Sequence, residues 1–253
     1  MGLWTRKITA GGMRLPRAPG QKGRFEAMTG ASARALDNDG MAPSRDTLLS
    51  NADALASYLA TRLAPIALEP VPPSDPALAL RIQGATPRHA AVLAPLYARE
   101  GKPYLLFTRR SSDLRAHSGE ISFPGGSRDP MDISLAHTAL RESYEELGLE
   151  QQSVTLLGAM PPAYTVVSNF LVTPYVGWLG DGLPTLNPQA SEVAEIIEAP
   201  VSALDDELIY HTEMWSRGGE AHAVHFYDFG PYRIWGLTGR LLHELLALLP
   251  PRF

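Results

Sequence analysis

The spacing of apolar residues along the chain predicts a few helices among many short strands. Between Asp46 and Leu63 apolar residues recur at helical intervals, which indicates one amphipathic helix that packs on a core. Helical patterns also span Ser134–Leu147 and Thr238–Leu249. Strand-like runs occupy seven segments: Ala90–Leu96, Tyr104–Thr108, Ile121–Phe123, Val154–Leu157, Phe170–Trp178, Val193–Ile197 and Ala223–Tyr227.

These elements interleave without a regular strand–helix alternation and without an internal repeat. A mixed sheet covered by helices fits this order better than a doubly wound parallel sheet does. We therefore expect an α/β protein, and within that class an α/β/α sandwich with a mixed β-sheet.

The first part of the chain has a different character. Residues 1–43 are rich in Gly, Ala, Arg and Pro and lack periodicity, which predicts a disordered N-terminal arm. Because seven basic residues stand against one acid up to Arg34, an organelle transit peptide is an alternative, as is a start ahead of Met28 or Met41. Residues 44–84 are predicted to hold the first helix and a proline-rich linker, and residues 85–253 the main domain.

Composition excludes several kinds of site. The chain has no cysteine, so disulfides, thiolate metal sites and cysteine nucleophiles are ruled out, and a reducing location such as the cytoplasm is expected. Any metal must bind oxygen or imidazole. The net charge of −5 gives no global reason to bind nucleic acid or an anionic membrane. No apolar run is long enough to predict a membrane span, and we expect neither kind of partner.

The helix predicted over Ser134–Leu147 carries acids on one face and small apolar residues on the other. Glu142, Glu145 and Glu146 stand at i, i+3 and i+4, so their carboxylates can converge on one point. The alternative is a solvated acidic face, but like charges at this spacing cost roughly 0.2–0.5 kcal/mol per pair. Gly148 is expected to end the helix, so these acids lie near its C-terminus. There the helix dipole disfavours each anion by roughly a further 0.3–1 kcal/mol.

A cation would relieve this repulsion. Arg141 can pair with Glu145, yet one arginine does not neutralise three carboxylates, so the pattern favours bound Mg²⁺ or Mn²⁺. Just before the helix, Gly125 and Gly126 let the backbone turn sharply and approach a ligand. The carbonyl of Gly126 could join the metal shell, although a pair of glycines by itself is more often a turn.

From Gly126 to Leu149 the sequence resembles the Nudix box. The second half reads Arg141-Glu142-Ser-Tyr-Glu145-Glu146-Leu-Gly148-Leu149 and matches the family pattern at every charged and glycine position. There are three departures: Asp132 replaces the usual glutamate, the spacing to Arg141 is one residue longer, and Ser143 replaces an aliphatic residue. The longer spacing is familiar in the coenzyme A branch, and it argues against Asp132 as a metal ligand.

The segment before the box resembles the signature of coenzyme A diphosphatases, since Arg110, Ser111, Arg115, Gly119 and Phe123–Gly126 are in register with it. Guanidinium groups suit phosphate, so Arg110 and Arg115 are candidate substrate-binding residues, with Ser111 and His117 as hydrogen-bonding neighbours. Alternatively one arginine forms a structural ion pair and His117 caps a loop. The resemblance covers about residues 88–249, including Ile234–Thr238.

This resemblance implies a Nudix hydrolase domain over residues 85–253 that cleaves coenzyme A to 3′,5′-ADP and 4′-phosphopantetheine. It implies Glu142, Glu145 and Glu146 as ligands of Mg²⁺ or Mn²⁺, with the carbonyl of Gly126 as a further ligand. Glu142, Glu145 and Arg141 are the expected catalytic residues, with Arg141 orienting the glutamates. The general base stays open: Glu145 is one candidate, and Glu192 and Glu195 are others.

Other functions remain compatible with the sequence. The substrate could be another nucleotide derivative such as NADH, ADP-ribose or a dNTP, because the box determines the chemistry but not the leaving groups. A Nudix-fold binding module without catalysis would be expected to lose acids from the box, whereas all three are present. A nucleic-acid role of the basic arm is disfavoured by the overall charge. Nudix proteins often dimerise, so a homodimer is a further expectation.

Overall fold

A computed structural model describes residues 43–68, 79, 82, 86–111, 119–166, 168–217 and 220–252. Residues 1–42 of the predicted arm, most of the predicted linker, Arg115 and His117 lie outside the described residues. In the part of the chain that is described, no helix is long and apolar enough to span a membrane.

The described helices are α1 (Arg45–Ser50), α2 (Ala52–Arg62), α4 (Leu135–Leu147), α5 (Val201–Leu204) and α6 (Gly236–Leu246). The first strands are β1 (Arg88–Arg99), β2 (Lys102–Arg110), β3 (Ile121–Ser122), β4 (Gly125–Ser127), β5 (Thr155–Ala159) and β6 (Ala163–Thr165). The later strands are β7 (Phe170–Asp181), β8 (Val193–Pro200), β9 (Tyr210–Arg217), β10 (Glu220–Phe229) and β11 (Tyr232–Trp235).

The main sheet is mixed, as the sequence predicts. Its long central strand β1 pairs in parallel with β7 and antiparallel with β2, and β8 pairs with the other edge of β2. The short strands β3 and β4 lie between β2 and β1: β3 pairs with the end of β2, and β4 pairs with the start of β1. Gly125 and Gly126 belong to β4 and are therefore part of the sheet.

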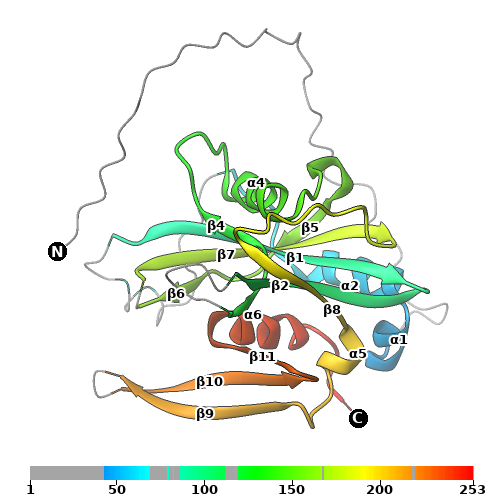
Figure 1. The fold of residues 1–253 in the computed structure, drawn as a ribbon. Coiled ribbons are helices and arrows are strands. Elements are labelled where there is room, and N and C mark those ends of the chain that lie inside the picture. The colour runs from blue at the N-terminus through cyan, green and yellow to red at the C-terminus, as the bar shows by residue number, and fades with distance from the viewer. Residues whose placement is uncertain are drawn as a thin grey trace, which may run out of the picture. The chain divides into compact units, whose positions relative to one another are not determined.

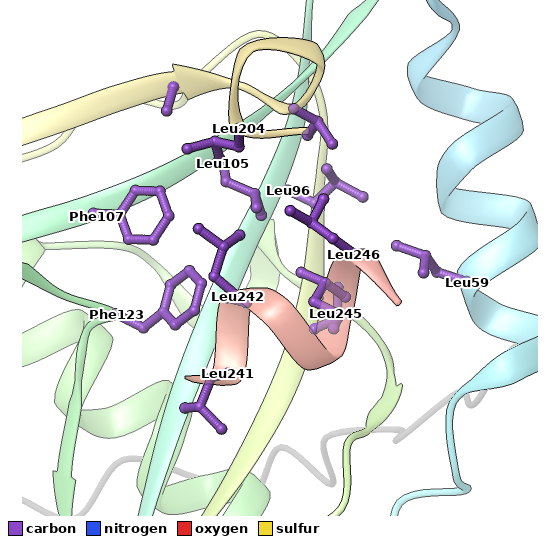
Figure 2. Packing of buried hydrophobic residues seen from close by; sticks show 14 of the residues in the cluster. Leu59, Leu96, Leu105, Phe107, Phe123, Leu204, Leu241, Leu242, Leu245 and Leu246 are labelled. Atoms are coloured by element: carbon purple, nitrogen blue, oxygen red, sulfur yellow. The ribbon is translucent and has the colours of Figure 1, made fainter. Parts of the chain in front are cut away.

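Helices cover both faces of the main sheet, which confirms the α/β/α arrangement (Figure 1). On one face α4 packs Leu135, Ala139 and Leu147 against buried residues of β1 and β2. On the other face α2 and α6 contribute a second core of leucines, and Figure 2 shows several of them around β1 and β2. The Figure 2 residues include Leu59, Leu96, Leu105, Leu242, Leu245 and Leu246.

A second sheet of β9, β10 and β11 packs on α6 and was only partly predicted. The sequence predicts β10, whereas β9 and β11 were missed. Along β9 the sequence Tyr-His-Thr-Glu-Met-Trp-Ser-Arg has no simple apolar alternation, because both of its faces carry polar and aromatic side chains. β9 pairs antiparallel with the next strand, β10: Tyr210 lies opposite Tyr227 and Arg217 opposite Glu220. The missing alternation in β9, and not distance along the chain, hid this pairing from the sequence.

The single helix predicted over residues 46–63 is wrong, because α1 and α2 are separate helices that meet at Asn51. The Asn51 backbone is extended, its side chain accepts from the amide of Ala54 at 3.0 Å, and this caps α2. The amide of Ala52 donates instead to the carbonyl of Gly101 at 2.9 Å. A local side-chain cap thus outcompetes the continuous helical pattern.

Candidate active site

The helix α4 begins and ends where the sequence predicts. Ser134 caps its start, since the Ser134 hydroxyl accepts from the amide of His137 at 3.1 Å. Gly148 ends it with φ of 67°, a left-handed conformation that glycine adopts without strain. The three glutamates of the box therefore lie in the last two turns of α4, beside the glycines of β4.

Glu146 is the most buried of these acids, with 4% of its surface exposed. Its Oε2 accepts from the amide of Gly125 at 3.3 Å, and its Oε1 lies 3.7 Å from Arg110 Nη1. Burial raises the pKa of Glu146 to about 8, although Arg110 and the amide of Gly125 oppose this. Glu142 and Glu192 add to the rise. The positive charge near the carboxylate is therefore too small to offset the cost of burying its ionised form.

Glu142 lies directly against the glycine loop. A Cβ placed on Gly126 would lie 2.5 Å from the carboxyl carbon of Glu142, so the carboxylate occupies the space that a side chain would need. Burial raises the pKa of Glu142, Arg141 lowers it, and the charges of Glu145 and Glu192 raise it further. Glycine at position 126 therefore allows the carboxylate of Glu142 to pack directly against the backbone of the loop.

The side chain of Glu145, unlike those of Glu142 and Glu146, is exposed to solvent. It is half exposed, at 52%, and its Oε2 accepts from Arg141 Nη1 at 2.9 Å. Over the described residues, no group of three Asp, Glu or His side chains is gathered closely enough to hold a metal ion. The structure brings Glu142 and Glu146 together at Gly125 and Gly126, while Glu145 is paired with Arg141 as the sequence predicts.

Arg141 is held by a buried acid that the sequence did not single out for this role. Asp132, 3% exposed, accepts from Arg141 Nε and Nη2, each at 2.9 Å. Arg141 also donates to the carbonyl of Ser127 at 3.1 Å and lies 3.0 Å from Glu142 Oε1. Burial opposes the ionisation of Asp132, but the bonds from Arg141, the amide of Asp129 and Thr138 keep its pKa well below the usual range.

Asp132 is therefore a positioning residue, outside the pair of glutamates at the loop. The longer spacing gave reason to doubt any role for Asp132 in the site, whereas the structure bonds it to Arg141, which in turn contacts Glu142. Its position in the box, where the family has an acid, could have indicated a role for Asp132. The extra residue before Arg141 made the contact between the two side chains hard to predict.

Two further acids were candidates for the general base, and the structure separates them. Glu192 precedes β8 and its charge acts on both Glu142 and Glu146. Its carbonyl accepts from the amide of Ser111 at 2.8 Å, which ties the buried Ser111 to this loop. Glu195 lies 2.9 Å from Arg109 and accepts from the Tyr232 hydroxyl at 2.6 Å, away from the box.

This donor set fits a divalent cation. Carboxylate oxygens are ligands that Mg²⁺ and Mn²⁺ prefer, and Glu142 and Glu146 supply them at the glycine loop. The raised pKa values of Glu142 and Glu146 indicate that these carboxylates need more positive charge than Arg110 and Arg141 supply. Glu145 lies on the same two turns of α4, one residue from Glu146.

Comparison with known proteins identifies the family. The model of the NUDIX domain matches residues 87–214, just over half of the chain. The chain belongs to the NUDIX family. A protein of Photorhabdus laumondii named "Uncharacterized Nudix hydrolase NudL" is 46% identical over 158 residues, which cover 62% of this chain and 83% of that one. A protein of the same name from Pectobacterium atrosepticum is 38% identical over 165 residues, 65% of this chain and 84% of that one.

The NUDIX domain includes the glycine loop, α4 and β8, so the site described above lies within it. The protein is accordingly a diphosphohydrolase of the Nudix class that acts on nucleoside diphosphate derivatives. Nudix hydrolases generally use divalent metal ions. Among solved structures, a Caenorhabditis elegans Ap4A hydrolase in a binary complex is 18% identical, with a TM-score of 0.38, over 46% of this chain and 81% of that one.

Proposed function

We propose that this Nudix hydrolase cleaves the diphosphate bond of coenzyme A or its derivatives. The observation that supports this most is the contact between the box and the segment that resembles the coenzyme A signature. Arg110, in that segment, lies 3.7 Å from Glu146, and Ser111 bonds to the backbone of Glu192. A guanidinium at this place can exchange the carboxylate for a phosphate oxygen, because both are anionic acceptors for its fork of donors.

Glu142, Glu146 and the carbonyl of Gly126 would hold the metal ion, with Glu145 as a further ligand after leaving Arg141. The bound ion would neutralise charge on the diphosphate oxygens and favour ionisation of a nearby water. Arg141 keeps the carboxylate of Glu142 in place, because Asp132 fixes the rest of its guanidinium. Arg141 is therefore proposed to act through the glutamates.

In the proposed reaction a water oxygen attacks one phosphorus, and the bond from that phosphorus to the bridging oxygen breaks. The products are 3′,5′-ADP and 4′-phosphopantetheine, and one proton of the water passes to a carboxylate. Glu145 and Glu192 are the two candidates for this base: Glu145 is exposed, and Glu192 acts electrostatically on both buried glutamates. Arg110 and Arg115 are proposed to bind the phosphates.

The test is to incubate the purified protein with coenzyme A, NADH, ADP-ribose and dGTP, with and without Mg²⁺ or Mn²⁺, and to measure product masses. We expect metal-dependent release of 3′,5′-ADP from coenzyme A. Glu145→Gln and Glu146→Gln should each lower turnover by about a hundredfold or more, since each removes a charged group from the site. The control is Glu150→Gln, the same change at an exposed residue just after α4, which should leave the rate unchanged.

Each other result would be informative. Efficient cleavage of NADH, ADP-ribose or dGTP in place of coenzyme A would reject the proposed substrate while keeping the Nudix chemistry. Equal rates for Glu146→Gln and the unchanged protein would reject the proposed metal ligands. Binding of a nucleotide without turnover of any compound in the panel would favour a binding module.

A further inference from the structure

A cavity lies on the face of the main sheet opposite to α4. It has a volume of about 630 Å³ and is bounded by the ends of β2, β3 and β8 on one side and by β11 on the other. The residues that line it include Arg109, Ile121, Glu195, Tyr232, Arg233 and Trp235. Small-molecule pockets have volumes of roughly 300–1,000 Å³, so the cavity is large enough for a nucleotide.

The cavity and the box glutamates lie on opposite faces of the sheet, near the end of β2. Arg109 lines it, while the next residue, Arg110, lies beside Glu146, because successive side chains of a strand point to opposite faces. Gly119 and Glu120 also line the cavity, and their backbones bond to the backbone of Arg110 at 3.2 and 3.0 Å. Arg109 in the cavity and Arg110 beside Glu146 are thus consecutive residues of β2 on opposite faces of the sheet.

One wall of the cavity is aromatic and held in place by its neighbours. The ring of Trp235 is parallel to that of the buried Phe226, with an interplanar angle of 1° and centroids 6.0 Å apart. Trp215 packs at 5.6 Å from Trp235 on the same small sheet. Tyr232 is fixed through its hydroxyl, which donates to Glu195 at 2.6 Å. Preorganised rings of this kind lose little entropy when a flat ligand stacks on them.

The charges of the cavity are already paired. Arg109 lies 2.9 Å from Glu195, and Arg233 donates to Asp228 at 2.7 Å. A part of the ligand that carries several phosphates would have to break these pairs, whereas an uncharged ring would not. Carboxylate and guanidinium groups at the edge can hydrogen-bond to the amine and ring nitrogens of such a base.

We propose that this cavity binds the purine base of the nucleotide half of the substrate, by stacking on Trp235. The inference rests on the proposed function insofar as the diphosphate is placed at the box glutamates. It adds a site that lies outside the box and includes residues of β11, beyond the match to the NUDIX domain. Aromatic stacking tolerates different substituents on the base, so specificity for coenzyme A would come from elsewhere in the site.

The test measures binding of 3′,5′-ADP and of AMP to the full chain by calorimetry, without metal so that no turnover is involved. Trp235→Ala should weaken both by about ten- to a hundredfold, because a stacked aromatic platform is lost. Trp235→Phe should restore most of the affinity. Met214→Ala removes an exposed side chain of the same sheet that does not line the cavity, and should weaken binding by no more than about threefold. Thermal unfolding of each variant checks that the small sheet is intact.

Unchanged affinity of Trp235→Ala for both nucleotides would overturn the proposal, as would an equal loss in Met214→Ala. Ribose 5-phosphate, which has no base, serves as the second probe: its affinity should not respond to Trp235→Ala, and an equal loss for it would also overturn the proposal. These results do not depend on which diphosphate is cleaved. If coenzyme A is not hydrolysed but the adenine nucleotides lose affinity in Trp235→Ala, the proposed substrate fails while the base site stands.

Discussion

A buried carboxylate, Asp132, holds the guanidinium of Arg141 beside the glutamates. Asp132 meets two nitrogens of the guanidinium and accepts further bonds from Thr138 Oγ1 and the amide of Asp129, each at 2.9 Å. Bidentate pairs of this kind fix the plane of an arginine as well as its position. The remaining nitrogen, Nη1, is then directed at Glu142 and Glu145.

Asp132→Asn should therefore impair catalysis without removing any proposed metal ligand. An asparagine offers one acceptor oxygen where the aspartate offers two charged ones, so Arg141 loses its fixed plane. We expect kcat to fall by about ten- to a hundredfold, as for other residues that orient a ligand of a metal site, with a smaller change in KM. Steady-state kinetics at saturating metal would measure this.

The control is Asp53→Asn, at an exposed residue in the first turn of α2, which should change neither parameter. Asp132→Glu restores the charge, and partial recovery of kcat would show that the guanidinium partner matters. An unchanged kcat in Asp132→Asn would mean that Glu142 holds Arg141 by itself.

At this scale the sequence was a good guide to side chains that share a helix face. The i and i+4 pairing of Arg141 with Glu145 follows from helical spacing, and so does the placing of Glu142 and Glu146 on one face of α4. The partner of Arg141 at Asp132 depends on how the loop before α4 folds back, which spacing does not encode. The same holds for Glu192, which the chain brings to the site over more than forty residues.

At the scale of elements, α6 and the small sheet are joined by a cluster of histidine and tyrosine rings. His225 on β10 stacks on His243 of α6 with centroids 4.3 Å apart, and its Nδ1 lies 3.0 Å from the Tyr210 hydroxyl. Burial lowers the pKa of His225, and the nearby His243 and Arg240 lower it further. The contact between the two elements is therefore built around a neutral imidazole.

This arrangement predicts a loss of stability in mild acid. Between the lowered pKa of folded His225 and its usual value, the unfolded chain binds more protons than the folded chain, so the free energy of unfolding falls as the pH is lowered. His225→Phe keeps a ring for stacking but cannot be protonated. The variant should lose less stability than the unchanged protein between about pH 7 and about pH 5, near the ordinary titration of histidine.

Urea unfolding at several pH values would measure the difference, with His222→Phe as the same substitution at another histidine of β10. His222→Phe should retain the acid sensitivity that His225→Phe loses. Parallel pH profiles for the unchanged protein and His225→Phe would show that His225 is not the group responsible.

At the scale of the whole molecule, the strongest tertiary features came from pairings that lie far apart in the chain. The interleaved pattern predicts a mixed sheet, and the parallel pairing of β1 with β7 joins residues 88–98 to residues 170–181. No local pattern determines that register, because it depends on helices burying both faces at once. The small sheet escaped prediction for a different reason: β9 and β10 are neighbours in the chain, but β9 lacks the apolar alternation that marks a strand.

The two cores imply that the matched NUDIX segment does not fold by itself. Residues 87–214 lack α2 and α6, whose leucines Leu55, Leu59, Leu242 and Leu245 are buried against β1 and β2. Burying one leucine stabilises a protein by roughly 1.5–3 kcal/mol, and a domain of ordinary stability has about 5–15 kcal/mol in total. Exposing one whole face of the sheet removes contributions of that combined size. In addition, Asp205 would lose Arg45 and Arg252, which both pair with it.

We therefore expect a chain of residues 43–253 to unfold cooperatively at the temperature of the full chain, and a chain of residues 87–214 to show no cooperative transition. Circular dichroism in the near ultraviolet, followed during heating, would measure both, because buried aromatic rings such as Phe107 and Phe123 report on side-chain packing. A cooperative transition in the short chain would mean that α4 and its leucine core suffice to fold the sheet. The face under α6 would then be dispensable for the box, although still needed for the cavity at Trp235.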